Sequence, residues 1–194
     1  MPARMILRRS VLTALLGLAG LLGLAGCLAP MADPGTNPGR LNLHLKAEVS
    51  GDQVRQAVRQ NPLQPVGRAT RGGVLGPNWH LDAYLVDAQG QEQRLPQAPD
   101  AGFSPVAGNA LDQRVSFLLP PGQQSVRLVL QAEVTHFWQE QSGPDLPVLN
   151  RQGQATSYDQ PDWRQRSSVV PVQEWRRELR LNLAPGQAHD LTWP

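Results

Sequence analysis

The stretch "LNLHLKAEV", residues 41–49, decides the fold because apolar and polar residues alternate along it without a break. Its apolar positions are Leu41, Leu43, Leu45, Ala47 and Val49. Successive side chains of a β-strand point to opposite faces, so this period of two predicts a strand with one buried face and one exposed face.

The same alternation recurs along the rest of the chain. The sequence "DAQG" at 87–90 suits a type I turn between a strand at 78–86 and a returning strand at 91–95. Further strands are predicted at 114–119, 125–135, 169–172, 174–183 and 189–194. Short strands with turn signals between them and little helix predict an all-β fold, an antiparallel β-sandwich, with a small closed barrel as the alternative.

The clearest predicted hairpin joins residues 114–119 to residues 125–135 through "PPGQQ". A second segment of the form L-x-P-G-Q, "LAPGQ", lies at 183–187. Because nothing else in the two regions is alike, we interpret them as similar turns that solve the same hairpin problem and not as an internal repeat.

Other segments carry weaker signals. Residues 50–62 fit either a short helix, in which Ser50 and Gln53 form a capping box, or an edge strand. Residues 67–77 are turn-rich and receive no element, residues 96–112 are predicted as a long loop, and residues 139–168 show little apolar pattern.

The order of strands loosely resembles the immunoglobulin-like and prealbumin-like sandwiches of exported bacterial proteins. No residue motif selects one of these families, and the Cys…Trp…Cys pattern of immunoglobulin domains is absent because the chain has a single cysteine. The resemblance therefore implies a fold class only.

The N-terminus has the layout of a secretory signal. Arg4, Arg8 and Arg9 precede an uncharged, mostly apolar run at 10–26, and the only cysteine, Cys27, follows directly. A membrane-spanning helix is the alternative, but crossing the hydrocarbon core takes ~20 apolar residues, and the glycines of this run weaken a helix. A cysteine among apolar residues is also often a small buried hydrophobe.

Leu24-Ala25-Gly26-Cys27 resembles the lipobox of bacterial lipoproteins. The resemblance covers residues 1–27 only. It implies that a diacylglycerol is attached to the Cys27 thiol and that the chain is cut between Gly26 and Cys27. A lipidated thiol needs no disulfide partner, which explains the lone cysteine. Residue 28 is Leu and not Asp, which by the same resemblance favours the outer membrane where the source has two membranes.

These features divide the chain into a signal peptide at 1–26, a lipidated cysteine with a Pro/Gly-rich tether at 27–40, and a single β-sandwich domain at 41–194. Three of the 18 basic residues lie in the signal, which leaves 15 against 16 acidic residues. A nucleic-acid-binding surface requires a basic patch, so we expect no nucleic-acid partner. The expected partners are the membrane, through the lipid on Cys27, and an envelope protein or glycan.

Little in the sequence indicates catalysis. His44, His80, His136 and His189 are not paired at i, i+2 or i, i+4, and no serine stands in a G-x-S-x-G elbow. His44 and His80 fall on the face expected to meet solvent, each beside a carboxylate of its own strand, Glu48 or Asp82. We expect no enzyme activity, no metal and no cofactor. The alternative is a small hydrolase or metal-binding protein that uses the histidines.

Trp138, Tyr158 and Trp163 lie in or beside the least patterned stretch, among Asp, Gln and Arg. Exposed rings beside such polar groups suit glycan or peptide binding, because rings stack on apolar faces while polar groups orient hydroxyls or amides. The other interpretation folds Trp138 and Trp163 down as caps over the sandwich ends. Trp175 has the same ambiguity, with Arg176 or Arg177 as a candidate cation–π partner. The sequence thus predicts a membrane-anchored envelope lipoprotein with a non-catalytic binding or structural module.

Overall fold

A computed structural model describes residues 29–63, 69–141, 146–160 and 163–194. The expected signal peptide, the Gly26–Cys27 cleavage site and the lipidation site lie outside these residues. In chain order the elements are β1 (Gly39–Glu48), α2 (Gly51–Gln60), β2 (Ala69–Val86), β3 (Glu92–Arg94), β4 (Ala110–Leu119), β5 (Gly122–Gln141), β6 (Leu146–Leu149), β7 (Ala155–Gln160), β8 (Trp163–Leu183) and β9 (Ala188–Trp193).

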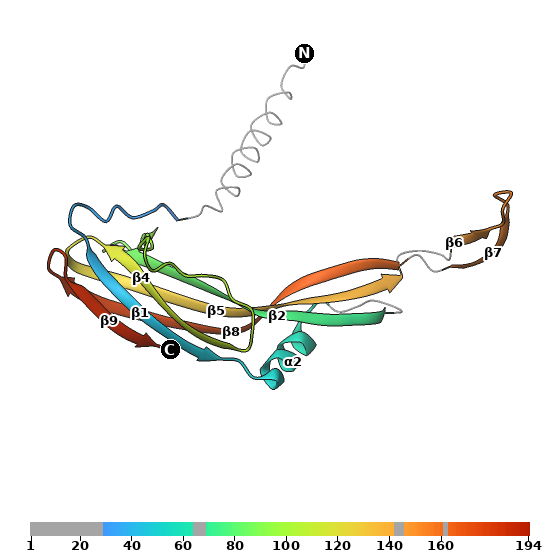
Figure 1. Cartoon of the computed structure of the whole chain (residues 1–194), viewed down its shortest axis with the longest axis horizontal. Helices are drawn as coiled ribbons and strands as arrows, with labels where there is room; N and C mark the ends of the chain where they lie inside the picture. Colours follow the sequence, from blue (N-terminus) through green and yellow to red (C-terminus); the bar gives the residue numbers. More distant parts are fainter. Residues whose placement is uncertain (1–28, 64–68, 142–145, 161–162) are drawn as a thin grey trace, which may run out of the picture.

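Two sheets face each other and share one core (Figure 1). One has the strand order β4-β1-β9, and the other has the order β3-β2-β5-β8. β1 and β9 run parallel, and the other pairs within these two sheets are antiparallel. The predicted all-β sandwich is confirmed.

The alternation at residues 41–49 produces the centre of the core. Leu41, Leu43 and Leu45 of β1 are buried. From the opposite sheet they meet the apolar positions of β2 and β5, which include Trp79, Leu81, Ala83, Val126, Leu128 and Leu130. The Trp79 indole N–H donates a hydrogen bond to the Gly108 carbonyl at 2.8 Å, which satisfies the one polar group that this ring brings into the core.

The predicted hairpin between residues 114–119 and 125–135 is wrong. β4 pairs with β1 and β5 pairs with β2 and β8, so the two strands belong to different sheets. Pro120 and Pro121 have no N–H group to continue a ladder, and the apolar faces of both strands turn inward from opposite sides of the core. Residues 184–187 make the same crossing between β8 and β9. Since Gly122 pairs with Leu183, the two similar turns lie side by side.

Two other local predictions are confirmed. β2 returns through 87–90 into β3, and the Gly90 N–H donates to the Asp87 carbonyl at 3.0 Å. Residues 51–60 form helix α2, with the predicted capping box: the Ser50 side chain accepts from the Gln53 N–H and the Gln53 side chain accepts from the Ser50 N–H. The edge-strand alternative for this segment is therefore wrong.

β2, β5 and β8 continue together beyond the sandwich as a three-stranded arm (Figure 1). We define the arm as residues 69–75, 133–141 and 163–171. The β6–β7 hairpin joins β5 to β8 at its tip. The sequence pattern does not show the arm because few of its apolar side chains are buried, Val134, Trp138 and Val170 among them, and its strands have no uniform apolar face to reveal their period. This is why residues 67–77 and 139–168 look irregular.

Bulges mark the point where the arm leaves the sandwich. β2 carries one extra residue at Gly76–Pro77, because Leu75 pairs with Thr135 and Asn78 pairs with Glu133, which leaves these two residues opposite Val134 alone. Val172 is the extra residue of β8 at the same level. Extra residues of this kind bend a strand and increase its twist. Gly76 has φ +105, and a Cβ there would lie 2.9 Å from the Asn78 nitrogen, so the bulge in β2 requires glycine.

Part of the expected tether is fixed to the body. The Arg94 N–H donates to the Pro30 carbonyl at 2.7 Å, and the Ala32 N–H donates to the Arg94 carbonyl at 2.8 Å. Ala32 is 2% exposed and belongs to the core cluster. Residues 30–32 therefore extend the β3 edge of the four-stranded sheet.

Candidate functional site

Two of the histidines, His44 and His80, bind carboxylates of neighbouring strands. His44 Nε2 lies 2.7 Å from Asp112 Oδ1 on β4, and His80 Nε2 lies 2.8 Å from Glu133 Oε1 on β5. The expected partners, Glu48 and Asp82, are thus not the ones found; Asp82 instead pairs with Arg94. The hydrogen bond from His44 lowers the pKa of Asp112.

His136 lies on the arm, on the face that continues the core-facing side of β5. Its ring packs on Trp138 with the ring centroids 5.0 Å apart. The buried Nδ1 atom has no hydrogen-bond partner among the described residues. Ser168 of β8 is directly opposite and accepts a hydrogen bond from the Asn61 side chain at 3.1 Å.

These groups do not form a catalytic relay. Glu140, the carboxylate of β5 on the same face as His136, accepts hydrogen bonds from the Trp138 indole at 3.1 Å and from Arg166 at 2.9 Å. Both donors favour its charged form and lower its pKa. His189 lies apart on β9, opposite Leu41. Nowhere in the described ranges do three His, Cys, Asp or Glu side chains gather in a group that could hold a metal ion.

The two tryptophans among the candidate ligand-binding aromatics do not form one surface. Trp138 is 6% exposed, so its ring is not available for stacking. Trp163 pairs with Gln141, three positions after Trp138 in β5, so the two indoles lie on opposite faces of the arm. Tyr158 belongs to β7, and its side chain lies outside the described residues.

Trp175 does not stack on a neighbouring arginine. Its ring stacks on Trp79 in the core, with centroids 5.6 Å apart and an interplanar angle of 20°. Arg176 pairs with Glu174 instead. The sheet alternation explains this result, because Arg176 and Trp175 point to opposite faces of β8.

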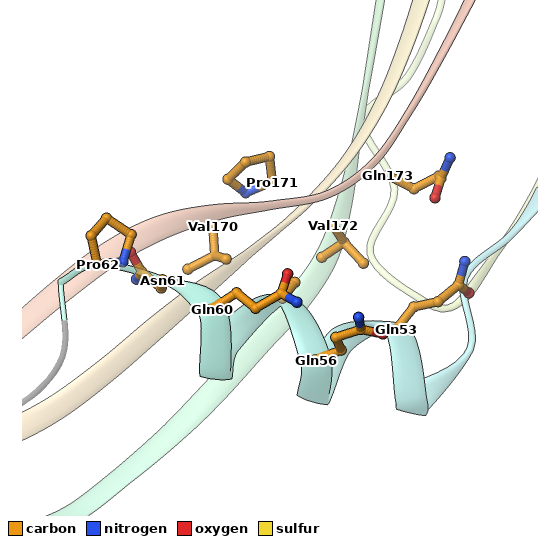
Figure 2. A pocket seen from close by; sticks show the side chains of 10 residues that line it. Gln53, Gln56, Gln60, Asn61, Pro62, Val170, Pro171, Val172 and Gln173 are labelled. Atoms are coloured by element: carbon orange, nitrogen blue, oxygen red, sulfur yellow. The ribbon is translucent and has the colours of Figure 1, made fainter.

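A groove of about 510 Å³ lies between α2 and β8 (Figure 2). In Figure 2 Val170 and Val172 point from β8 toward the helix, and Pro171 points away from it. None of the described lining residues is charged; they are Gln53, Gln56, Ala57, Gln60, Asn61, Pro62, Val170, Pro171, Val172 and Gln173. The groove therefore combines an apolar floor with side-chain amides, each of which both donates and accepts hydrogen bonds.

Local sequence places α2 beside β8. The Ser50 cap starts the helix directly after β1, and Val54 packs against the core. At the other end, the hydrogen bond from Asn61 to Ser168 connects the helix end to β8. The helix has no buried residue, so most of its polar surface is open to a ligand. Gln53, Gln56 and Gln60 follow a spacing of three and four, which was the one sequence signal for this groove.

A second hollow, of about 590 Å³, lies at the end of the sandwich where the chain crosses between sheets. Asp87 of the β2–β3 turn and Arg180 of β8 line it together with Gln123 and Gln124. It is open and mixed in charge, and it lies apart from the α2–β8 groove.

The outer face of the arm exposes two large apolar side chains. Leu75 is 61% exposed and Val169 is 57% exposed. Both pair with Thr135 of β5, Leu75 from β2 on one side and Val169 from β8 on the other. On the next row, the Phe137 ring lies over Gly73, where an added Cβ would come within 2.6 Å of it.

No protein-family model, curated protein or solved structure matches this chain. Within the described ranges, no helix has the length and apolar character needed to cross a membrane.

Proposed function

We propose that the protein is a lipid-anchored component of the bacterial cell envelope and that its β-sandwich is a non-catalytic binding or structural module. The observation that carries the proposal is the N-terminal sequence, a basic start, an uncharged apolar run and Leu24-Ala25-Gly26-Cys27. The leucine at position 28 favours the outer membrane where two membranes exist.

Anchoring of this kind requires more than one acyl chain. A single chain gives only marginal binding, whereas a diacylglycerol, with ~0.8 kcal/mol per buried methylene, holds a protein firmly at a bilayer. Processing at Gly26–Cys27 removes the basic residues of the signal, so the mature protein relies on the lipid and not on basic charge.

The α2–β8 groove supports the binding half of the proposal. Its lining has no charged side chain and offers Gln53, Gln56, Gln60 and Asn61 beside an apolar floor. Amides of this kind pair with the N–H and C=O groups of a peptide or with sugar hydroxyls, so the fitting ligand is an uncharged peptide segment or glycan. The earlier candidates Trp138, Tyr158 and Trp163 receive no such support, because the two tryptophans lie on opposite faces of the arm.

The anchor is tested by expressing the full chain in a lipidating host. We expect a mature species that begins at Cys27, carries acyl mass and partitions with membranes, and we expect the Cys27→Ser variant to lose both properties. An unmodified chain that retains residues 1–26 contradicts the proposal and indicates a membrane-spanning N-terminus.

The groove is tested by titrating ¹⁵N-labelled protein with capped neutral peptides and with neutral oligosaccharides. We expect the side-chain amide signals of Gln53 and Asn61 and the backbone amide signal of Ala57, all in the groove lining, to shift with one of these two classes and to respond less to a charged peptide. The paired variant Gln56→Leu/Gln60→Leu is expected to lose the response, and Gln123→Leu at the opposite end of the sandwich serves as the matched control. Equal responses in all variants would show that the groove is not the binding site.

A further inference from the structure

The body of the protein begins only three residues after the lipidation site. Pro30 and Ala32 are hydrogen-bonded to Arg94 of β3, and Ala32 is buried. An extended chain covers at most ~3.3–3.6 Å per residue, so Pro30 lies within about 11 Å of the Cys27 backbone. The lipid attachment therefore holds the β3 edge close to the bilayer, whatever conformation the intervening residues adopt.

The chain that joins the lipid to this edge is uncharged from Cys27 to Ala32, and Asp33 is the first charged residue. Met31 lies in the middle of the fixed part, bridged to Arg94, and is 63% exposed. A large apolar side chain that faces outward at this point, next to an acyl anchor, suits the boundary between headgroups and acyl chains.

The short connection also limits how the body is oriented. Neighbouring strands are about 4.8 Å apart, so β8, the third strand from β3 in the sheet, lies roughly 14 Å farther from the attached edge. This distance exceeds the reach of the linker. Figure 1 agrees with this arrangement, since the segment after residue 29 leaves the body on one side and α2 lies on the opposite side.

We infer that the β3 edge faces the lipid surface, with Met31 in its interfacial layer, and that the α2–β8 groove opens away from the membrane. The inference rests on the proposed lipidation of Cys27. It adds that the groove receives a partner from the envelope space and not a lipid headgroup, and that β2, β5 and β8 run alongside the bilayer.

The test uses the full, lipidated protein with one added cysteine. Because the thioether consumes the Cys27 thiol, an introduced cysteine is the only reactive one. Met31→Cys and Gln56→Cys are each labelled with a fluorophore, and the protein is reconstituted into phosphatidylethanolamine/phosphatidylglycerol vesicles that carry a nitroxide at the headgroup level. We expect quenching several-fold stronger at position 31 than at position 56.

A variant with a roughly ten-residue Gly/Ser insert between Ala29 and Pro30 is the matched control, since such an insert adds about 17 Å of average reach. It is expected to retain vesicle binding and to lose most of the quenching at position 31. Vesicle binding with equal quenching at both positions, or with stronger quenching at 56, overturns the orientation while the anchor stands. Failure of the protein to bind vesicles overturns the proposed lipidation, and the orientation with it.

Discussion

At the scale of the residue, alternation predicted which side chains face solvent but not which side chains they meet. His44 and His80 lie on the exposed faces expected for them, yet their partners Asp112 and Glu133 come from neighbouring strands. Asp82, two positions from His80, pairs with Arg94. Glu48 lies four residue rises along the strand from His44, whereas a diagonal neighbour on the next strand is in reach of a long side chain. The partner therefore depends on register, which a single strand does not encode.

Glu140 is expected to stabilise the arm in a pH-dependent way. Hydrogen bonds from Trp138 and Arg166 lower the pKa of this carboxyl in the folded state. A carboxyl of this kind contributes stability above its unfolded pKa, about 4.3 for glutamate, and the contribution is lost as the pH falls through the folded value. Wild type should lose more free energy of unfolding between pH 7 and pH 3 than Glu140→Gln, as measured by urea denaturation. Glu178→Gln, at an exposed position, is the control. If Glu140→Gln loses as much free energy of unfolding as wild type does, the expectation is contradicted.

We expect Trp175 to stabilise the fold through its stacking on Trp79 and not through a contact with an arginine. Trp175→Ala removes the ring that stacks on Trp79 and is expected to lower the free energy of unfolding by about 3 kcal/mol. Arg176→Ala, at an exposed position, should change it by less than about 0.5 kcal/mol. Chemical denaturation of the two variants checks both values. A large effect of Arg176→Ala would instead favour the cation–π pair that the sequence suggests.

At the scale of the element, the strands of the core were predictable and their pairing was not. The residues at 114–119 and 125–135 alternate as the strands of a hairpin do. Two strands joined by a turn that crosses between sheets show the same alternation, because their apolar sides also face one core. The adjacent prolines are the feature that distinguishes the two arrangements, since they remove the N–H groups that a hairpin would use. The arm was missed for a different reason: it buries only a few apolar side chains, such as Val134, Trp138 and Val170, which are too few to produce a regular period of two in its strands.

The bulge in β2 should be sensitive to any side chain at Gly76. Alanine there must adopt φ +105 and place its Cβ 2.9 Å from the Asn78 nitrogen. We expect Gly76→Ala to lower the free energy of unfolding by about 1–3 kcal/mol. Gly51→Ala is the matched control, since a Cβ at this exposed helical position meets nothing closer than 3.5 Å and alanine favours a helix by up to about 1 kcal/mol. Equal stability of the two variants, measured by urea denaturation, would mean that the bulge relaxes without glycine.

At the scale of the whole molecule, the sequence predicted a sandwich and an anchored N-terminus but not their connection. Composition suggested a free tether through residue 40, and no pattern reveals that Ala32 is buried, since one small side chain has no periodicity. The groove depends in the same way on contacts between distant residues, because α2 meets β8 across a sequence separation of 107 residues at the Asn61–Ser168 hydrogen bond. Only the spacing of the glutamines on α2 was visible beforehand.

The tip of the arm should be dispensable for folding of the sandwich. Every described residue of the core cluster lies outside residues 142–162, and Gln141 is paired directly with Trp163. An Asn-Gly turn is the natural two-residue closure for an antiparallel pair, so it can replace residues 142–162.

Each halving of a connection lowers the closure cost by about 0.6 kcal/mol, so the free energy of unfolding is expected to stay the same or to rise by up to ~2 kcal/mol. Urea denaturation followed by tryptophan fluorescence measures this value. The amide signals of the α2–β8 groove should still shift with the same neutral peptide or oligosaccharide. A decrease of several kcal/mol in the free energy of unfolding would contradict this expectation, because it would show that contacts of the tip stabilise the sandwich.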